Sequence, residues 1–181
     1  MADNHDIEGF LSYMGFDNDC AVPCYNVQFN YLNIDSRIKQ LSIPLEIYSL
    51  KDIPGRIINL FNDSLAYSEE FDQLSYMIKS PLSVYDEYSL CYIRNDQIVA
   101  CILLENSSKS DVISIDSVYS KSDAVRELAT LWAALYRRLS EKYPNGKDVL
   151  FSSFDQIKNN AIMKLFSDVK TETVHYNEIQ I

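Results

Sequence analysis

The sequence lacks long apolar runs and basic clusters, and each absence narrows the possible functions. No stretch of this 181-residue chain approaches the ~20 apolar residues of a membrane-spanning helix, and its acidic start is unlike a signal peptide. We therefore expect a cytoplasmic protein. It carries 16 Lys and Arg against 26 Asp and Glu, a net charge of −10, and its basic residues form no stripe. Such a negative charge repels phosphate groups, so we do not expect nucleic acid as a partner. We also expect no membrane partner. The negative electrostatic field of the chain favours a cationic amine as substrate.

Cysteine and histidine are too sparse for a disulfide framework or a metal centre. The four cysteines are Cys20, Cys24, Cys91 and Cys101. The first two have a metal-like spacing, but no second Cys/His pair accompanies them, and the only histidines are His5 and His175. We therefore expect no metal site. The last two fall in predicted strands and are expected to pack as small hydrophobic residues.

Hydrophobic periodicity predicts strands alternating with helices, as in an α/β domain. Predicted strands are Tyr25–Tyr31, Leu45–Leu50, Ser89–Arg94, Ile98–Glu105, Asp111–Val118, Val149–Phe154 and Thr173–Ile181. Predicted helices are 3–16, one that starts near Asp52, 69–79, 123–142 and 156–167, with 33–44 as a linker.

The predicted helices have identifiable faces and ends. The helix near Asp52 is expected to bury Ile57, Leu60 and Phe61, and the next helix Phe71, Leu74 and Ile78. Ser122 or Asp123 is expected to cap the long helix, because short polar side chains accept hydrogen bonds from the first free N–H groups.

Two segments, 155 positions apart, follow one template. They read Asn4-x-x-Ile7-x-x-Phe10-Leu11-x-x-x-Gly15-Phe16 and Asn159-x-x-Ile162-x-x-Leu165-Phe166-x-x-x-Lys170-Thr171. The apolar spacing is typical of a short amphipathic helix, and Asn suits its N-terminus. The repeat is too long for a solenoid and about right for one domain.

The template resembles the fourth helix of the GNAT acetyltransferases, whose signature is Asn-x-x-Ala-x-x-Leu-Tyr-x-x-x-Gly-Phe. The order of elements over residues 45–181 is also similar to that family. The resemblance implies an α/β fold with a mixed, mostly antiparallel sheet flanked by helices. Residues 1–40 then resemble the C-terminal end of a preceding unit. Their apolar strand Tyr25–Tyr31 is expected to pair with the 45–181 domain or with a second copy in a homodimer.

The resemblance implies acetyl-CoA as the cofactor, held where the fourth strand of the domain turns into the long helix. The family pattern there is Arg/Gln-x-x-Gly-x-Gly/Ala, but residues 119–128 contain no glycine, and Asp123 and Glu127 add negative charge. We therefore expect weak binding, with Lys121 or Arg126 reaching the phosphates. The implied cofactor-binding residues are Ser117, Val118, Lys121, Ala124, Val125, Arg126, Asn159 and Phe166.

The catalytic groups of the family are only partly present. A tyrosine of the fourth helix protonates the departing thiolate in the family, and Phe166, which has no proton to give, stands there. The base would be a carboxylate on the central strands, and Asp116 and Glu105 are the candidates. Each is also consistent with an ordinary solvated acid.

Three functions follow from the resemblance. The first is an N-acetyltransferase acting on a small-molecule or peptide amine. The second is a catalytically inactive domain kept for stability, dimerisation or regulation. The third, a CoA-binding regulatory module, needs the same loop as the first. Cofactor binding discriminates the first two.

Overall fold

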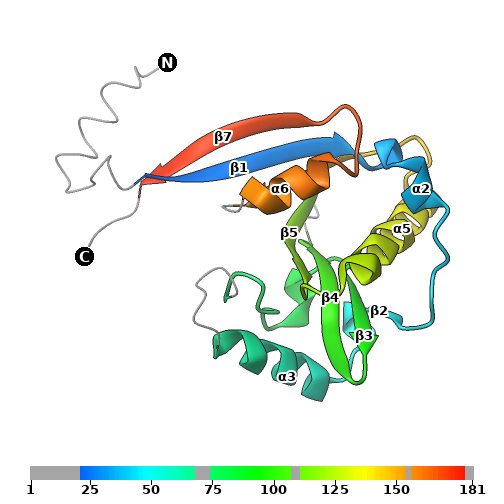
Figure 1. Cartoon of the computed structure of the whole chain (residues 1–181), viewed down its shortest axis with the longest axis vertical. Helices are drawn as coiled ribbons and strands as arrows, with labels where there is room; N and C mark the ends of the chain where they lie inside the picture. Colours follow the sequence, from blue (N-terminus) through cyan, green and yellow to red (C-terminus); the bar gives the residue numbers. More distant parts are fainter. Residues whose placement is uncertain (1–20, 68–73, 107–110, 154–155, 178–181) are drawn as a thin grey trace.

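The computed structural model describes residues 21–67, 74–106, 111–153 and 156–177, and shows one twisted sheet with helices on both faces (Figure 1). The sheet has seven strands in the order β2-β3-β4-β5-β6-β1-β7. The strands are β1 Ala21–Asn30, β2 Ile47–Ser49, β3 Leu90–Arg94, β4 Gln97–Leu104, β5 Ile113–Ser120, β6 Asp148–Ser153 and β7 Lys170–Asn177. The helices are α2 Ser36–Lys39, α3 Gly55–Ala66, α5 Val125–Lys142 and α6 Gln156–Met163. The predicted helix 3–16 lies outside the described residues.

The strand pairing confirms a mixed, mostly antiparallel sheet. All neighbours are antiparallel except β5 and β6, which are parallel, as the predicted fold requires. That parallel pairing runs only from Ile113–Val149 to Ile115–Phe151. Beyond Ile115 the two strands are no longer paired, so the sheet has a fork there.

Strand β1 lies inside the sheet, between β6 and β7. It pairs with β6 from Tyr25 to Asn30 and with β7 from Ala21 to Gln28. Of the two partners expected for this strand, the structure shows the rest of its own chain. Val27, Phe29 and Tyr31 of its inward face, the last just past the strand end, are at most 3% exposed.

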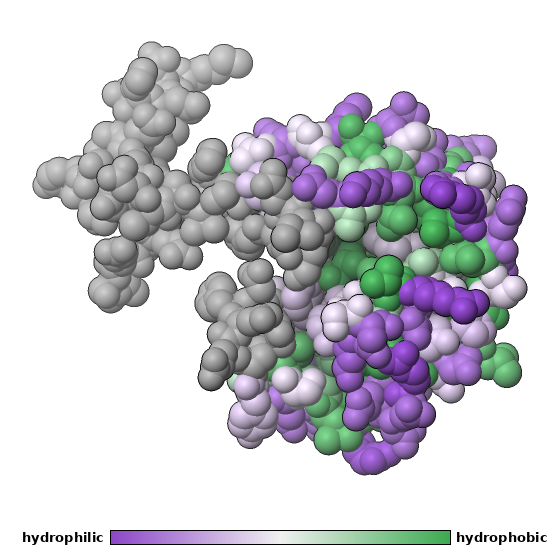
Figure 2. Space-filling model, viewed as in Figure 1, coloured by the Kyte–Doolittle hydropathy of each residue, from purple (hydrophilic) through white to green (hydrophobic). Residues whose placement is uncertain are grey.

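Each face of the sheet carries its own apolar core. Ile102 and Leu104 of β4 pack with Leu131 and Trp132 of α5 on one face. Cys101 and Leu103 pack with α3 on the other. Because β4 is covered on both faces, its sequence is a continuous apolar run. Away from these cores, apolar residues are interspersed with hydrophilic ones on the face shown in Figure 2.

Three details differ from the sequence predictions. In α3, Ile57 and Phe61 are buried as predicted, but Leu60 is 51% exposed and Ile58 is buried instead. The predicted helix 69–79 does not reach its expected end, since residues 77–79 are not helical, and Leu74 is 45% exposed. Ile78 is buried as expected, but Asn62 of α3 holds its backbone N–H and C=O at 2.8 and 2.9 Å. The predicted linker contains α2, capped by the side chain of Asp35.

No helix among the described residues is both long and apolar enough to cross a membrane.

Replacing Gly146 by Ala is expected to lower the free energy of unfolding by about 1–3 kcal/mol. Gly146 has a φ of +84°, and an added Cβ would lie 2.8 Å from both Asn30 Oδ1 and Leu32 Cδ1. Urea unfolding of the variant measures the loss. The matched control is Gly55→Ala at the start of α3, where nothing lies within 4 Å, and it should be neutral or slightly stabilising. Equal effects of the two substitutions would contradict the described turn.

Candidate active site

A β-bulge lies at the fork of the sheet. Leu103 of β4 pairs with Ser117, and Leu104 pairs with Ile115, so Asp116 of β5 is an extra residue without a partner on β4. Bulges redirect side chains and are frequent beside active sites. Here the bulge directly follows the last residue of β5 that pairs with β6. The backbone of β5 beyond this point has no partner strand on that edge among the described residues.

The bulge holds a buried carboxylate with an unused oxygen. The Asp116 side chain is 9% exposed, and its Oδ1 accepts a hydrogen bond from Lys79 Nζ at 2.5 Å. Its Oδ2 and the hydroxyl of Ser117 are both buried, and neither has a hydrogen-bond partner among the described residues. Buried polar atoms without partners are rare in folded proteins and call for a functional explanation.

The backbone of Lys79 is held in place beside Asp116. Its N–H donates to the hydroxyl of Tyr85 at 2.8 Å, and the preceding residue is held by Asn62. The hydrogen bond to Asp116 is the main cause that raises the pKa of Lys79, so the ammonium form is favoured. Burial raises the pKa of the Tyr85 phenol, which therefore stays neutral as a hydrogen-bond partner.

Aromatic side chains line the same face of the sheet. The ring centroid of Tyr119 on β5 lies 5.1 Å from Phe61 of α3 and 5.6 Å from Tyr76. Tyr119 pairs with Cys101, and Ser117 pairs with Leu103, so both face the α3 side of the sheet. Burial raises the pKa of Tyr119. This side of the fork is therefore aromatic, with one buried acid.

The two predicted carboxylates lie in different environments. Glu105 follows β4, is exposed, and its backbone N–H donates to Ser114 O at 3.0 Å. It also acts on Lys79, since its charge contributes to the raised pKa of that residue. Both carboxylates therefore interact electrostatically with Lys79, but only that of Asp116 is buried.

The start of α5 differs from the sequence prediction. Its N-cap residue is Ala124, with no side-chain cap, so the expected cap at Ser122 or Asp123 is wrong. Asp123 instead binds Arg94 at 2.6 Å, and the same guanidinium binds Glu127 at 2.9 Å. Arg94, which sequence reasoning missed, therefore pairs with both acids of the turn and offsets one of their two negative charges.

Four of the predicted cofactor residues, Lys121, Ala124, Val125 and Arg126, lie in this turn. Lys121 Nζ donates to Gln97 Oε1 at 2.9 Å, Arg126 is exposed, and Val125 is 69% exposed. Ala124 is buried, as is Val118, which packs on the α5 side of the sheet.

The residues of this turn fit a coenzyme A phosphate group, although not tightly. Positive φ angles occur at Asn95, Asp96, Gly146 and Asp168 among the described residues, and none lies in the 119–128 turn. The missing glycines are therefore not needed for the backbone shape, but side chains stand where glycine would allow a close approach. The uncapped helix N-terminus and two nearby cations remain to attract an anion.

Phe166 lies in the core and not on a helix. Helix α6 ends at Met163, four residues before the predicted end. Phe166 stacks on Phe29 with centroids 3.9 Å apart and lies edge-on to Trp132 at 5.3 Å. Asn159 belongs to α6, but its side chain lies outside the described part.

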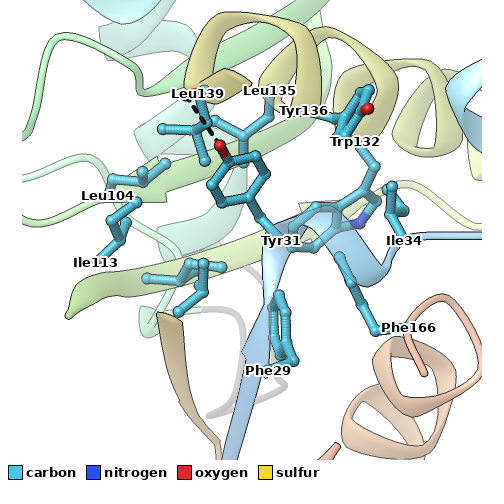
Figure 3. Close-up of a pocket in the computed structure, with 12 residues that line it drawn as sticks. Phe29, Tyr31, Ile34, Leu104, Ile113, Trp132, Leu135, Tyr136, Leu139 and Phe166 are labelled. Carbon is cyan, nitrogen blue, oxygen red and sulfur yellow. Dashed lines mark hydrogen bonds between the residues drawn. The ribbon is translucent and has the colours of Figure 1, made fainter. Parts of the chain in front are cut away.

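These rings line a small void under α5 (Figure 3). Its volume is about 10 Å³, which is about the size of one water molecule, and its lining is apolar. Side chains from β1, α5 and the segment after α6 point toward one another there, and Trp132 Nε1 is buried without a partner among the described residues. This void is a packing defect of the core and not a substrate pocket.

A larger groove adjoins the bulge through Tyr85. It measures about 470 Å³ and is lined by Leu50, Lys51, Leu82, Ser83, Tyr85, Asp86, Glu87, Asn106 and Lys142. The Tyr85 hydroxyl accepts a hydrogen bond from the backbone N–H of Lys79, so Tyr85 lines this groove and also holds the segment that carries Lys79.

Comparison with known proteins identifies the fold. No protein-family model and no curated protein matches the sequence. Among solved structures, the chain resembles a GCN5-related glucosamine N-acetyltransferase region of a fungal multi-domain β-N-acetylglucosaminidase, with a TM-score of 0.60 and 12% identity over 98% of this chain and 23% of that one. It also resembles a Drosophila protein (TM-score 0.57, 13% identity, 97% and 57% covered) and a GCN5-related N-acetyltransferase from Kribbella flavida (0.53, 10%, 95% and 63%).

The chain therefore has the GNAT fold. It spans less than two thirds of each of these three structures. At such low identity the likeness concerns the fold, and activity must be argued from the site.

Proposed function

We propose that this protein is a GNAT-type N-acyltransferase that moves an acetyl group from acetyl-CoA to a primary amine of a small molecule or peptide. The observation that carries the proposal is the buried Asp116 carboxylate on the bulge, where the fork leaves the β6-facing edge of the β5 backbone without a partner strand among the described residues. A proton acceptor and free backbone donors thus occur together. Acyl transfer to an amine needs both of them.

Each group has a defined role in this proposal. Asp116 removes one proton from the bound ammonium, and the neutral nitrogen then attacks the acyl carbon. As the N–C bond forms, the C–S bond breaks, and the departing thiolate takes the second proton of the nitrogen to leave as the coenzyme A thiol. Acetyl-CoA supplies that carbon as an activated thioester. The N–H groups of β5 beyond the bulge stabilise the oxyanion. Tyr119 and Tyr76 exclude water from the α3 side.

The cofactor would be held by the first turn of α5. Val125 and Arg126 present backbone N–H groups there, whereas that of Ala124 already donates to Lys121 O at 2.9 Å. Arg126 adds one cation, and Lys121 adds a second. Arg94 offsets one of the two negative charges of Asp123 and Glu127, which reduces the repulsion of phosphate.

The alternative is a non-catalytic GNAT-like domain, and two observations favour it. The turn 119–128 has no glycine, and Phe166, at the position of the family acid, is 6% exposed within the core. A regulatory CoA-binding module would rely on the same turn as the enzyme.

Calorimetric titration of the full chain with acetyl-CoA separates these functions. Each N–H to phosphate hydrogen bond is worth about 1.5–3 kcal/mol. Losing two or three lowers affinity by about two to five orders of magnitude, so we expect saturable binding weaker than the low-micromolar range. Arg126→Ala should weaken it further, while Arg56→Ala, at an exposed arginine of α3, should not.

The outcomes are distinct. A dissociation constant at or below the low-micromolar level would show that other groups replace the glycines, and the non-catalytic alternative would lose its main support. Absence of saturation at millimolar acetyl-CoA would favour that alternative.

A further inference from the structure

Buried polar atoms at the bulge lack hydrogen-bond partners within the part of the chain that the structure describes. A carboxylate can accept about four hydrogen bonds, and Asp116 receives one from the described residues, that of Lys79. Its Oδ2 is buried without a partner among the described residues, as is the adjacent Ser117 hydroxyl. Leaving such atoms unsatisfied is costly, so a ligand with N–H groups would be favoured.

We propose that Asp116 and Ser117 form a binding site for a primary alkylammonium group, and that the Lys79 side chain occupies this site until such a ligand displaces it. The inference rests on the proposed function, because it names the acceptor class for the same site. Lys79 is then an internal stand-in for the acceptor.

Exposure shows why Lys79 can leave. Its side chain is 59% exposed, whereas that of Asp116 is 9% exposed. The lysine therefore reaches in from solvent and can withdraw without opening the core. Its backbone stays in place, since Tyr85 and Asn62 hold this segment. Only one flexible side chain has to move.

Charge and surroundings specify the ligand. An anion would meet Asp116 and the nearby Glu105, both negative, so the site selects a cation. A primary ammonium has three donors on a compact head, enough for Asp116 Oδ2 and the Ser117 hydroxyl together. Tyr76 and Tyr119 line the same side, and aromatic rings attract cations and pack against an alkyl chain. A lysine side chain or an alkyl diamine has these properties.

Competition with Lys79 reduces the apparent affinity of such a ligand. If Lys79 fills the site about nine-tenths of the time, its removal raises the affinity about tenfold. The effect should occur only where the displaced lysine contacts Asp116. Removal of another exposed lysine should not raise the affinity in this way, because that lysine does not occupy the Asp116 site.

The test is an NMR titration of the full chain with n-butylammonium, in the absence of acetyl-CoA. Lys79→Met should bind the probe about tenfold more tightly than the natural chain. The matched control is Lys142→Met, which removes an exposed lysine paired with Glu87 at 3.5 Å and should leave the affinity unchanged. Asp116→Asn should abolish binding, and Ser117→Ala should weaken it severalfold.

The proposal is overturned if Lys79→Met changes the affinity less than about threefold or weakens it, since relief of competition predicts about tenfold. It is equally overturned if Asp116→Asn still binds the probe. Lys79→Gln provides a second variant, and far-UV circular dichroism verifies the fold of each. The titration contains no acetyl-CoA, so it tests ammonium binding separately from acetyl transfer. If the chain binds the ammonium as predicted but a separate assay finds no acetyl transfer, the proposed function alone is refuted. If the assay finds acetyl transfer but Lys79→Met does not tighten binding, this inference alone is refuted.

Discussion

Deleting residues 1–40 is expected to abolish the cooperative fold of the remaining chain. These residues contain β1, which pairs with β6 along one edge and with β7 along the other. In the sheet order β6 and β7 are not neighbours, so the deletion removes the only strand that joins β7 to the sheet among the described residues. The loss also exposes the core under α5.

The energies support this expectation. Val27, Phe29 and Tyr31 are buried, and each such side chain contributes about 1.5–3 kcal/mol by burial. Their sum approaches the whole stability of a typical domain, about 5–15 kcal/mol. Circular dichroism and urea unfolding should show no cooperative transition for the truncated chain. If it is monomeric, soluble and as stable as the full chain, β1 is dispensable and this account of the sheet is wrong.

A point substitution tests the same contact in a graded way. Phe29→Ala removes a ring that stacks on Phe166 and should cost about 3–5 kcal/mol. Leu60→Ala is the control, because Leu60 is 51% exposed and its loss should change stability by no more than about 0.5 kcal/mol.

The largest functional effect is expected for Asp116→Asn. The substitution keeps the shape of the side chain but removes the proton acceptor, so kcat/KM for acetyl transfer should fall by about 10²–10⁴. Glu105→Gln serves as the control, since that carboxylate is exposed and should matter less than about tenfold. Release of the coenzyme A thiol measures both rates. If Glu105→Gln caused the larger loss, the base would have been assigned to the wrong residue.

The fold was predictable because its strands and long helix have clear periodicity. Strict alternation in Tyr25–Tyr31 predicted a strand that needed a partner, and the structure pairs it within the chain. Its place between β6 and β7 was not predictable, because alternation shows which side chains are buried but not which strand lies beside them.

The site was only partly predictable. Asp116 was found because it lies on the fourth strand of the domain, but Lys79 is 37 positions away and carries no local signal. Arg94 is 29 positions from Asp123, and its charge draws that carboxylate away from the expected capping role. Such pairs depend on tertiary packing, which sequence periodicity does not contain. Phe166 was placed on a helix that ends three residues earlier, where the chain turns to bridge with Ile34.

The proposed acyl transfer is tested most directly by mass spectrometry of primary amines incubated with the full chain and acetyl-CoA. The account predicts that an alkyl diamine or a lysine-containing peptide gains an acetyl group, at a rate that saturates in both substrates and is lost in Asp116→Asn. If no amine in a panel of such acceptors is modified at saturating acetyl-CoA, the enzyme assignment is contradicted. The chain would then be a non-catalytic GNAT-like domain.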